Sequence, residues 1–149
     1  MILLEIMKPK FLYNGSIRKI LGYLTPHKPE DLENRKENIK KGVYASNIKN
    51  DSIAMAIISS KGVIYASLSF KKRKKALIYE GWPKQRYIYL YTLPSITFNK
   101  SSNKSSQWVS RIKVKPTKIE RLKIKDYIHL IRKATEKEIK SFKTKYKLK

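Results

Sequence analysis

The chain of 149 residues contains no cysteine, only five glycines and only 11 acidic residues. Without cysteine, the protein has no thiol nucleophile, no zinc–thiolate site and no disulfide. The glycines stand singly, so there is no glycine-rich loop to cradle a phosphate, and a P-loop enzyme is not expected. The one acidic cluster, residues 30–37, stands among lysines and arginines, which we expect it to offset rather than to bind the metal ions of a nuclease.

Histidines and long apolar runs are also scarce. His27 and His129 are the only histidines, and neither has the spacing to acidic residues that a metal site or a catalytic triad requires. The apolar start, Met1 to Met7, is interrupted by Glu5 and is too short for a secretion signal or a membrane span. We therefore expect a cytoplasmic protein that holds no metal and has no membrane partner.

Positive charge is what the chain has in excess. It carries 35 Lys and Arg against 11 Asp and Glu, a formal net charge of +24. Such an imbalance attracts polyanions and releases their counterions on binding, so nucleic acid is the first partner to consider. A low-GC genome also enriches lysine, isoleucine, asparagine and tyrosine together, so codon bias is an alternative explanation for part of the excess. A net charge of +24 is nevertheless far above what solubility requires.

The charge is concentrated in two places. The last 50 residues carry 17 Lys and Arg against four acids, whereas the first 99 carry 18 against seven. The second concentration is a run of five consecutive cations, which no apolar core accommodates. This run is expected to be a solvated turn or a nucleic-acid-binding loop, and it consists of Lys71, Lys72, Arg73, Lys74 and Lys75.

Composition and patterning predict a folded protein of mixed α and β structure. Hydrophobic residues make up 41% of the chain, which argues against a disordered basic tail, and no repeat or linker divides residues 1–149, so we expect one domain. Asp51 is expected to cap a buried helix that runs to Ser60. Two β-rich runs flank the five cations and predict a hairpin with a basic tip. The predicted strands cover residues 10–14, 43–46, 63–70, 76–80, 86–93, 107–114 and 117–124.

The strand predicted at 86–93 has an aromatic and an aliphatic face. Tyr87, Tyr89 and Tyr91 alternate with Ile88 and Leu90, and alternate residues of a strand point to opposite faces. The tyrosine face either packs against a helix, which we favour, or stays exposed and stacks on nucleic-acid bases.

Apolar residues at steps of three and four predict a last helix over residues 126–149, with Asp126 as its N-cap. A basic amphipathic helix can lie along a phosphate backbone, on an anionic membrane or on its own domain. We expect the apolar side to pack on the domain and the basic side to remain free for binding. The cations expected to contact nucleic acid here are Arg132, Lys133, Lys137 and Lys140.

Three short motifs stand in the same order as in one known superfamily. Leu12-Tyr13-Asn14-Gly15-Ser16 and Gly42-Val43-Tyr44-Ala45-Ser46 are similar to its first two strand motifs, and Gln107-Trp108-Val109-Ser110 is similar to a third, found in small bacterial and phage members. On these residues the chain resembles the ADP-ribosyltransferase-like superfamily, which includes diphtheria-toxin-like enzymes, poly(ADP-ribose) polymerases and RNA 2′-phosphotransferases. The matches extend from residue 11 to about residue 125.

The resemblance implies an α+β fold with a split antiparallel β-sheet, one buried central helix and an NAD-binding cleft. It implies that Asn14, Gly15, Tyr44 and Ser46 bind NAD, with Tyr44 stacking on nicotinamide, and that Gln107 stands at the catalytic position. Asn14 replaces the usual histidine and can still hydrogen-bond a ribose hydroxyl. Gln107 replaces the usual glutamate and supplies no negative charge to the developing cation of the transition state.

These observations leave two hypotheses and a variant of the first. In the first, the protein is a nucleic-acid-binding module on a degenerate transferase-like scaffold and contacts RNA or DNA mainly through phosphate. In the second, it is an active NAD-dependent ADP-ribosyltransferase or RNA 2′-phosphotransferase-like enzyme that acts on nucleic acid or on a nucleic-acid-bound protein. Lysine-dominated contacts predict weak sequence specificity and steep salt dependence. In the variant, the chain is one subunit of a larger ribonucleoprotein or phage-encoded assembly.

Overall fold

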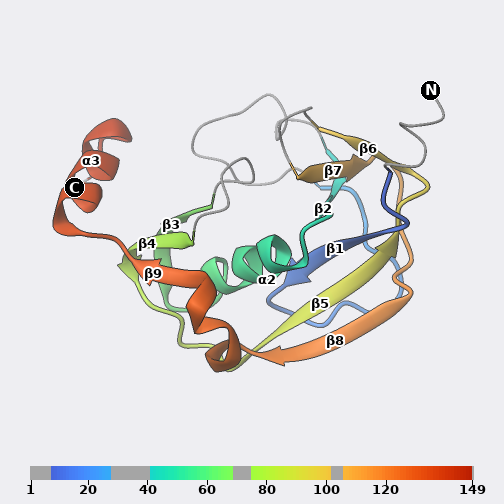
Figure 1. Ribbon diagram of the computed structural model, residues 1–149, viewed down its shortest axis with the longest axis horizontal. Coiled ribbons are helices and arrows are strands. Elements are labelled where there is room, and N and C mark those ends of the chain that lie inside the picture. The colour runs from blue at the N-terminus through green and yellow to red at the C-terminus, as the bar shows by residue number, and fades with distance from the viewer. Residues whose placement is uncertain (1–7, 28–40, 69–74, 102–105, 149) are drawn as a thin grey trace.

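The computed structural model describes residues 8–27, 41–68, 75–101 and 106–148, and in these residues the fold is α+β with mostly antiparallel sheets (Figure 1). The larger sheet has the strand order β6-β7-β2-β1-β5-β8 and its pairs are all antiparallel. Its strands are β1 (Phe11–Ser16), β2 (Val43–Ser46), β5 (Tyr87–Pro94), β6 (Phe98–Lys100), β7 (Gln107–Ser110) and β8 (Lys118–Lys123).

The smaller sheet has three strands in the order β3-β4-β9, namely β3 (Val63–Ser67), β4 (Ala76–Gly81) and β9 (Ile131–Lys133). The hairpin predicted around the five cations is confirmed, because β3 and β4 pair antiparallel with Ser67 opposite Leu77. Strand β9 joins β4 in parallel. Residues 69–74, which hold most of the predicted basic tip, lie outside the described residues.

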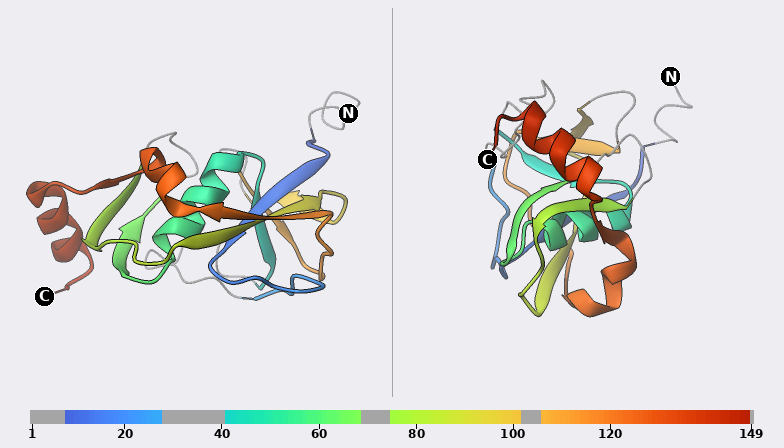
Figure 2. Two further views of the ribbon diagram at one scale, coloured as in Figure 1. Left: turned by 90° about the horizontal axis from the view of Figure 1, so that it is seen from below. Right: turned by 90° about the vertical axis from the view of Figure 1, so that its left-hand side faces the viewer.

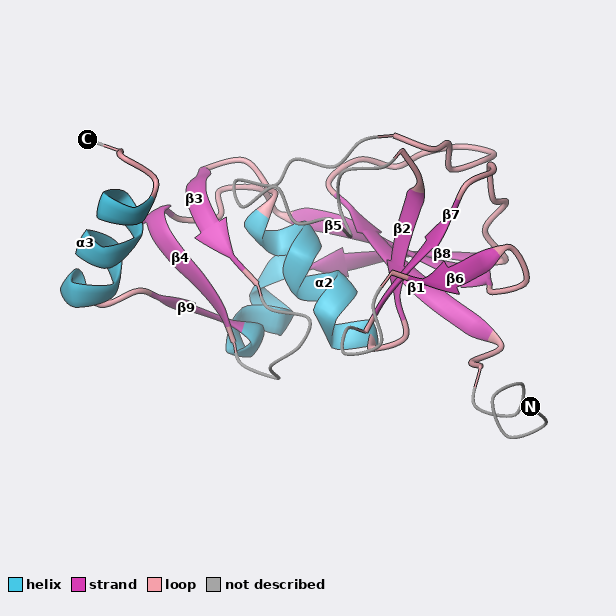
Figure 3. Ribbon diagram, turned by 90° about the horizontal axis from the view of Figure 1, so that it is seen from above, coloured by secondary structure: helices cyan, strands magenta, loops and turns pink. Residues whose placement is uncertain are grey.

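Helix α2 (Lys49–Ile58) lies between the two sheets (Figure 3). Its Ile53 and Ile57 side chains are fully buried and pack with Ile78 of the smaller sheet and with Ile88 and Leu90 of the larger one. Burial of an isoleucine side chain contributes about 1.5–3 kcal/mol relative to exposure, so this helix is a main source of cohesion between the sheets.

The predicted N-cap of this helix is wrong. The helix begins at Lys49, Ile48 occupies the N-cap position without a side-chain cap, and Asp51 lies in the first turn. The Ser46 hydroxyl accepts a hydrogen bond from the Ile48 N–H at 3.0 Å and turns the chain before Asp51 is reached. The carboxylate of Asp51 instead accepts a hydrogen bond from the Ser106 hydroxyl at 2.9 Å.

A second core covers the opposite face of the larger sheet. The alternation predicted for β5 is confirmed, because Ile88 and Leu90 join the α2 core whereas Tyr91 joins the second one. The Tyr91 hydroxyl accepts a hydrogen bond from the Ile20 N–H at 2.6 Å and donates one to the Arg18 carbonyl at 3.0 Å. The second core also contains Leu12, Leu24, Val43, Ala45, Leu93, Phe98, Trp108 and Val114.

Among the described residues, the segment 18–24 therefore covers part of the tyrosine face. Leu24 is buried against Tyr91, whose exposed fraction is 0%. Tyr87 and Tyr89 are only half-buried. Tyr91 therefore cannot stack on nucleic-acid bases, whereas Tyr87 is partly exposed.

The predicted continuous helix over residues 126–149 is wrong. Residues Ile124–Leu130 form the 3₁₀ segment η2, strand β9 follows, and only Glu136–Lys145 form the α-helix α3. Ile131 is buried in the α2 core because β9 adds to the smaller sheet. Apolar spacing could not reveal this strand, because Ile131 is its only apolar residue and a single position has no period.

Helix α3 begins at a capping box. The Thr135 hydroxyl accepts a hydrogen bond from the Glu138 N–H at 3.2 Å, and a Glu138 carboxylate oxygen accepts one from the Thr135 N–H at 2.9 Å. The helix lies at one end of the molecule, beyond β4 and β9 (Figure 2). Phe142 fastens it there by stacking on Tyr79 with 4.0 Å between ring centroids.

Gly15 of β1 allows α2 to approach the larger sheet closely. A Cβ at this position would lie 2.2 Å from the Ser52 carbonyl oxygen and 2.8 Å from the Ala56 Cβ. The Ser52 hydroxyl donates a hydrogen bond to the Tyr13 carbonyl at 2.7 Å, which holds the helix at this spacing. The close packing of α2 is therefore a structural reason for a glycine in the first motif.

We predict that Gly15→Ala destabilises the protein by about 3 kcal/mol, because the methyl group meets helix backbone that cannot move aside. Urea unfolding followed by circular dichroism measures the change. The matched control is Gly22→Ala, where the added Cβ meets nothing within 4 Å but the φ of +81° costs about 1 kcal/mol for alanine. Equal destabilisation by the two substitutions would contradict the tight packing of α2 on β1.

Candidate nucleic-acid interface

The three motif segments lie on neighbouring strands, since β7, β2 and β1 are adjacent in the larger sheet. Tyr13 pairs with Ser46, and Ser46 pairs with Gln107. Directly opposed residues of antiparallel strands point to the same face, so these three side chains share the face that α2 covers. Tyr44, two residues before Ser46, points to the same side.

Asn14 stands apart from the other motif side chains. It follows Tyr13 in β1, so its side chain points to the opposite face of the sheet from Ser46 and Gln107. Its Nδ2 donates a hydrogen bond of 2.6 Å to the Tyr44 carbonyl oxygen, which ties β1 to β2. The structure thus places Tyr44, Ser46 and Gln107 on one face of the sheet and Asn14 on the opposite face.

A polar network surrounds Ser46 at the start of α2. The Ser46 hydroxyl donates to the Ser106 hydroxyl at 3.2 Å, and Ser106 donates to Asp51. Ser46 and Gln107 are buried, with exposed fractions of 1% and 6%. Burial also raises the pKa of the Tyr44 hydroxyl above its ordinary value, although the positive charge of Arg111 opposes the shift, so Tyr44 stays protonated at neutral pH.

The sequence-predicted cations divide into two groups. Lys71, Lys72, Arg73 and Lys74 lie outside the described residues, whereas Lys75 is exposed immediately before β4. Lys133 is exposed on β9, and Lys137 and Lys140 are exposed on α3.

Arg132 is engaged within the protein. Its two terminal nitrogens donate to the two carboxylate oxygens of Glu138, each at 2.9 Å. The bidentate pair raises the pKa of Arg132 and lowers that of Glu138 to about 2, helped in the latter by the Thr135 N–H. Arg132 therefore joins β9 to α3, and this part of the surface also carries acidic side chains.

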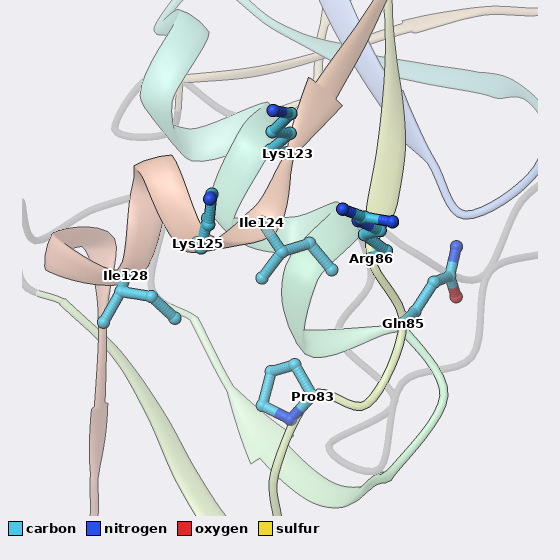
Figure 4. A pocket seen from close by; sticks show the side chains of 7 residues that line it. All are labelled: Pro83, Gln85, Arg86, Lys123, Ile124, Lys125 and Ile128. Atoms are coloured by element: carbon cyan, nitrogen blue, oxygen red, sulfur yellow. The ribbon is translucent and has the colours of Figure 1, made fainter.

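A second basic region was not found from the sequence. A pocket of about 250 Å³ opens where β5 begins, β8 ends and η2 starts, and the Ile124 N–H donates to the Arg86 carbonyl at 3.0 Å across this junction. Figure 4 shows its lining, which consists of Pro83, Gln85, Arg86, Lys123, Ile124, Lys125 and Ile128. Only the pairing of β5 with β8 brings Arg86 beside residues 123–125, and no local pattern indicates that pairing.

Tyr87 stands next to this pocket between cations. The Arg121 guanidinium carbon lies 4.4 Å from the centroid of the Tyr87 ring and that of Arg86 lies 5.6 Å from it. Lys123 is directly opposite Tyr87 in the β5–β8 ladder, and Arg121 is opposite Tyr89, so both cations lie on the tyrosine face.

Two further cations lie beside the tyrosine face. The Gln85 side-chain amide donates to the Ile17 carbonyl at 2.6 Å, and Tyr91 binds the Arg18 carbonyl, so the segment with Arg18 and Lys19 runs along β5. We name the whole region the β8 basic surface and define it as Arg18, Lys19, Arg86, Arg121, Lys123 and Lys125.

The cations of the β8 basic surface are exposed, and within the described part of the chain none of them forms an ion pair. Two acids are adjacent in sequence to these cations, Glu120 before Arg121 and Asp126 after Lys125. Glu120 of β8 points to the other face, where Lys49 and Lys118 approach it at 3.8 and 3.7 Å. The surface therefore has a strong positive potential that is not compensated by its own acids.

Two other classes of site are not seen in the described ranges. No three side chains of the His, Asp and Glu types come together there in a way that could hold a metal ion. No helix in those ranges is both long enough and apolar enough to span a lipid bilayer.

Comparison with known proteins does not assign a family. No family model matches the sequence, and no curated protein and no solved structure matches it significantly.

We predict that the Arg132–Glu138 pair stabilises α3 above about pH 4.5 and that this stabilisation is lost as the pH falls towards 2. The pKa of Glu138 is lowered to about 2 from 4.5 on folding, so the folded state favours the ionised carboxylate and loses that advantage only when the carboxylate is protonated. An NMR titration of the Glu138 carboxyl carbon gives the pKa, and hydrogen exchange of the α3 amides gives the stability.

The matched variant is Arg132→Gln, which should raise the Glu138 pKa towards its ordinary value while the Thr135 contribution remains. A wild-type Glu138 that titrates at the same pH as in Arg132→Gln would show that the ion pair does not form in solution.

Proposed function

We propose that this protein binds nucleic acid, mainly through the phosphate backbone, and that the β8 basic surface is its principal contact region on an ADP-ribosyltransferase-like scaffold. The observation that carries the proposal is the convergence, around the half-buried residue Tyr87, of exposed cations that form no ion pair with any described residue. Phosphates can neutralise these cations without breaking any internal ion pair, and each contact releases counterions from the nucleic acid.

The composition of the surface favours nucleic acid over a merely solvated face. Codon bias towards lysine does not explain two arginines, Arg86 and Arg121, held against one tyrosine ring. Guanidinium groups bind phosphate in a forked geometry and also stack on flat rings, whereas lysines act as point charges. Exposed Lys75, Lys133, Lys137 and Lys140 would extend the contact to other parts of a long polyanion. The same surface would serve a subunit of a larger ribonucleoprotein.

The second candidate is an NAD-dependent ADP-ribosyltransferase or RNA 2′-phosphotransferase-like enzyme. It is favoured by one specific observation, that motif segments far apart in sequence lie on the adjacent strands β7, β2 and β1 with Tyr44, Ser46 and Gln107 on a shared face. The burial of Ser46 and Gln107, and the position of Asn14 on the other face, make this the weaker of the two candidates.

For the first candidate we predict that the affinity for oligonucleotides falls steeply with salt. The triple variant Arg86→Gln, Lys123→Gln, Lys125→Gln should lower the slope of log Kd against log salt by about 2, at roughly 0.7 per phosphate contact of a single strand. Fluorescence anisotropy of a labelled oligonucleotide over a salt series measures both slopes.

The control removes the same charge elsewhere, in Lys10→Gln, Lys100→Gln, Lys115→Gln, and should change the slope much less. Circular dichroism confirms that both variants fold. A wild-type affinity that does not respond to salt would overturn nucleic-acid binding. Equal slopes in the two triple variants would instead reject the β8 basic surface as the principal contact.

The enzyme candidate makes a separate prediction. If NAD is cleaved at the motif strands, Gln107→Glu should raise the rate of nicotinamide release, because a carboxylate stabilises the developing positive charge. Incubation of wild type and variant with labelled NAD and RNA or DNA measures both nicotinamide release and label transfer. No release and no transfer from either protein would eliminate this candidate.

A further inference from the structure

The pocket beside the β8 basic surface has two chemically different sides. In Figure 4 the cations Arg86, Lys123 and Lys125 lie along one side, Pro83 and Ile128 lie along the other, and Ile124 lies between them. Ile124 is buried and belongs to the α2 core, whereas Ile128 is 38% exposed. The pocket thus combines a fixed apolar floor with an open cationic rim.

We propose that this pocket holds one unpaired nucleotide of single-stranded nucleic acid. The base would lie against Pro83 and Ile128, and its phosphate would contact the cationic rim. The inference rests on the proposed function. It adds that the bound nucleic acid is single-stranded and that one of its bases lies in this pocket.

The size of the pocket fits one small planar group. Clefts that enclose a whole drug-sized ligand measure roughly 300–1,000 Å³, and this pocket of about 250 Å³ is smaller. A duplex keeps the faces of its bases stacked inside and offers mainly phosphate to an apolar concavity. A single strand can turn a base outwards and place its face on an apolar or aromatic surface.

The charge around the pocket and the flat surface beside it both favour a bound nucleotide. Three like charges around one small pocket repel one another, and an anion in the pocket relieves that repulsion. Asp126 is exposed and forms no ion pair with these cations in the described part of the chain. Next to the pocket, the Arg121 guanidinium lies over Tyr87 and provides a second flat surface for an adjacent base.

The pocket contains little that could read the identity of a base. Gln85 is the one neutral polar side chain among the lining residues, and its hydrogen bonds are made inside the protein. Its Nε2 donates to the Ile17 and Tyr87 carbonyls at 2.6 and 2.8 Å, and its Oε1 accepts from the Lys61 N–H at 3.3 Å. The base is therefore held by its face and not by its edge, so we expect little sequence preference.

The test measures the contribution of the base to affinity separately from that of the phosphates. Anisotropy is measured at one salt concentration with a short oligothymidylate and with an abasic oligomer of the same length and charge. Wild type should bind the oligothymidylate several-fold more tightly, because a base placed on Pro83 and Ile128 removes apolar surface from water and the abasic oligomer has no base to place there. Ile128→Ser should lower this ratio, since only the Tyr87–Arg121 surface then remains to hold a base, whereas Ile128→Val, which keeps the apolar contact, should preserve most of it.

The matched control is Ile96→Ser, at an isoleucine that is 85% exposed and lies outside the pocket, which should leave the ratio unchanged. An oligouridylate of equal length tests whether RNA and DNA share the site, and a duplex of equal charge should be insensitive to Ile128→Ser. Equal binding of abasic and base-containing oligomers by wild type would overturn the inference. If that binding still depends on salt, the proposed function survives, whereas loss of salt dependence removes both.

Discussion

The burial of α2 between two sheets is the interaction on which the rest of the structure depends. Three short strands, β3, β4 and β9, have little stability by themselves, and the isoleucines of α2 join them to the larger sheet through a common core. Gly15 sets how closely the helix approaches that sheet. The polar network of Ser46, Ser106 and Asp51 then fixes where the helix starts.

The proposed binding region takes its rigidity from the same core. Ile124 is buried among the α2 contacts, while its two neighbours, Lys123 and Lys125, are exposed. This single turn of chain therefore fixes Ile124 in the core and holds the two neighbouring lysines at the surface on either side of it. Gln85 adds a second support, because its amide fastens the segment that bears Arg18 and Lys19 to the start of β5.

Local patterns predicted the elements whose apolar spacing is unambiguous. The alternation at Ile88 and Leu90 gave β5 with its two faces, and the apolar run after Asp51 gave a buried helix. The apolar spacing of the C-terminal region predicts one helix, but Ile131 belongs to a parallel strand, and the helix that does form begins at the Thr135–Glu138 capping box and not at Asp126. The pocket could not be predicted from local sequence patterns, because it exists only through the pairing of β5 with β8.

Strand β8 is also an edge strand of the larger sheet, and its tyrosine face carries Arg121 and Lys123. An uncovered strand edge can recruit the edge of another molecule, and charged side chains are a common defence against such pairing. Arg121 and Lys123, which form no ion pair in the described part of the chain, are placed to oppose such pairing with a second copy. If a polyanion binds there as proposed, its charge would neutralise these cations and leave the strand edge open to pairing.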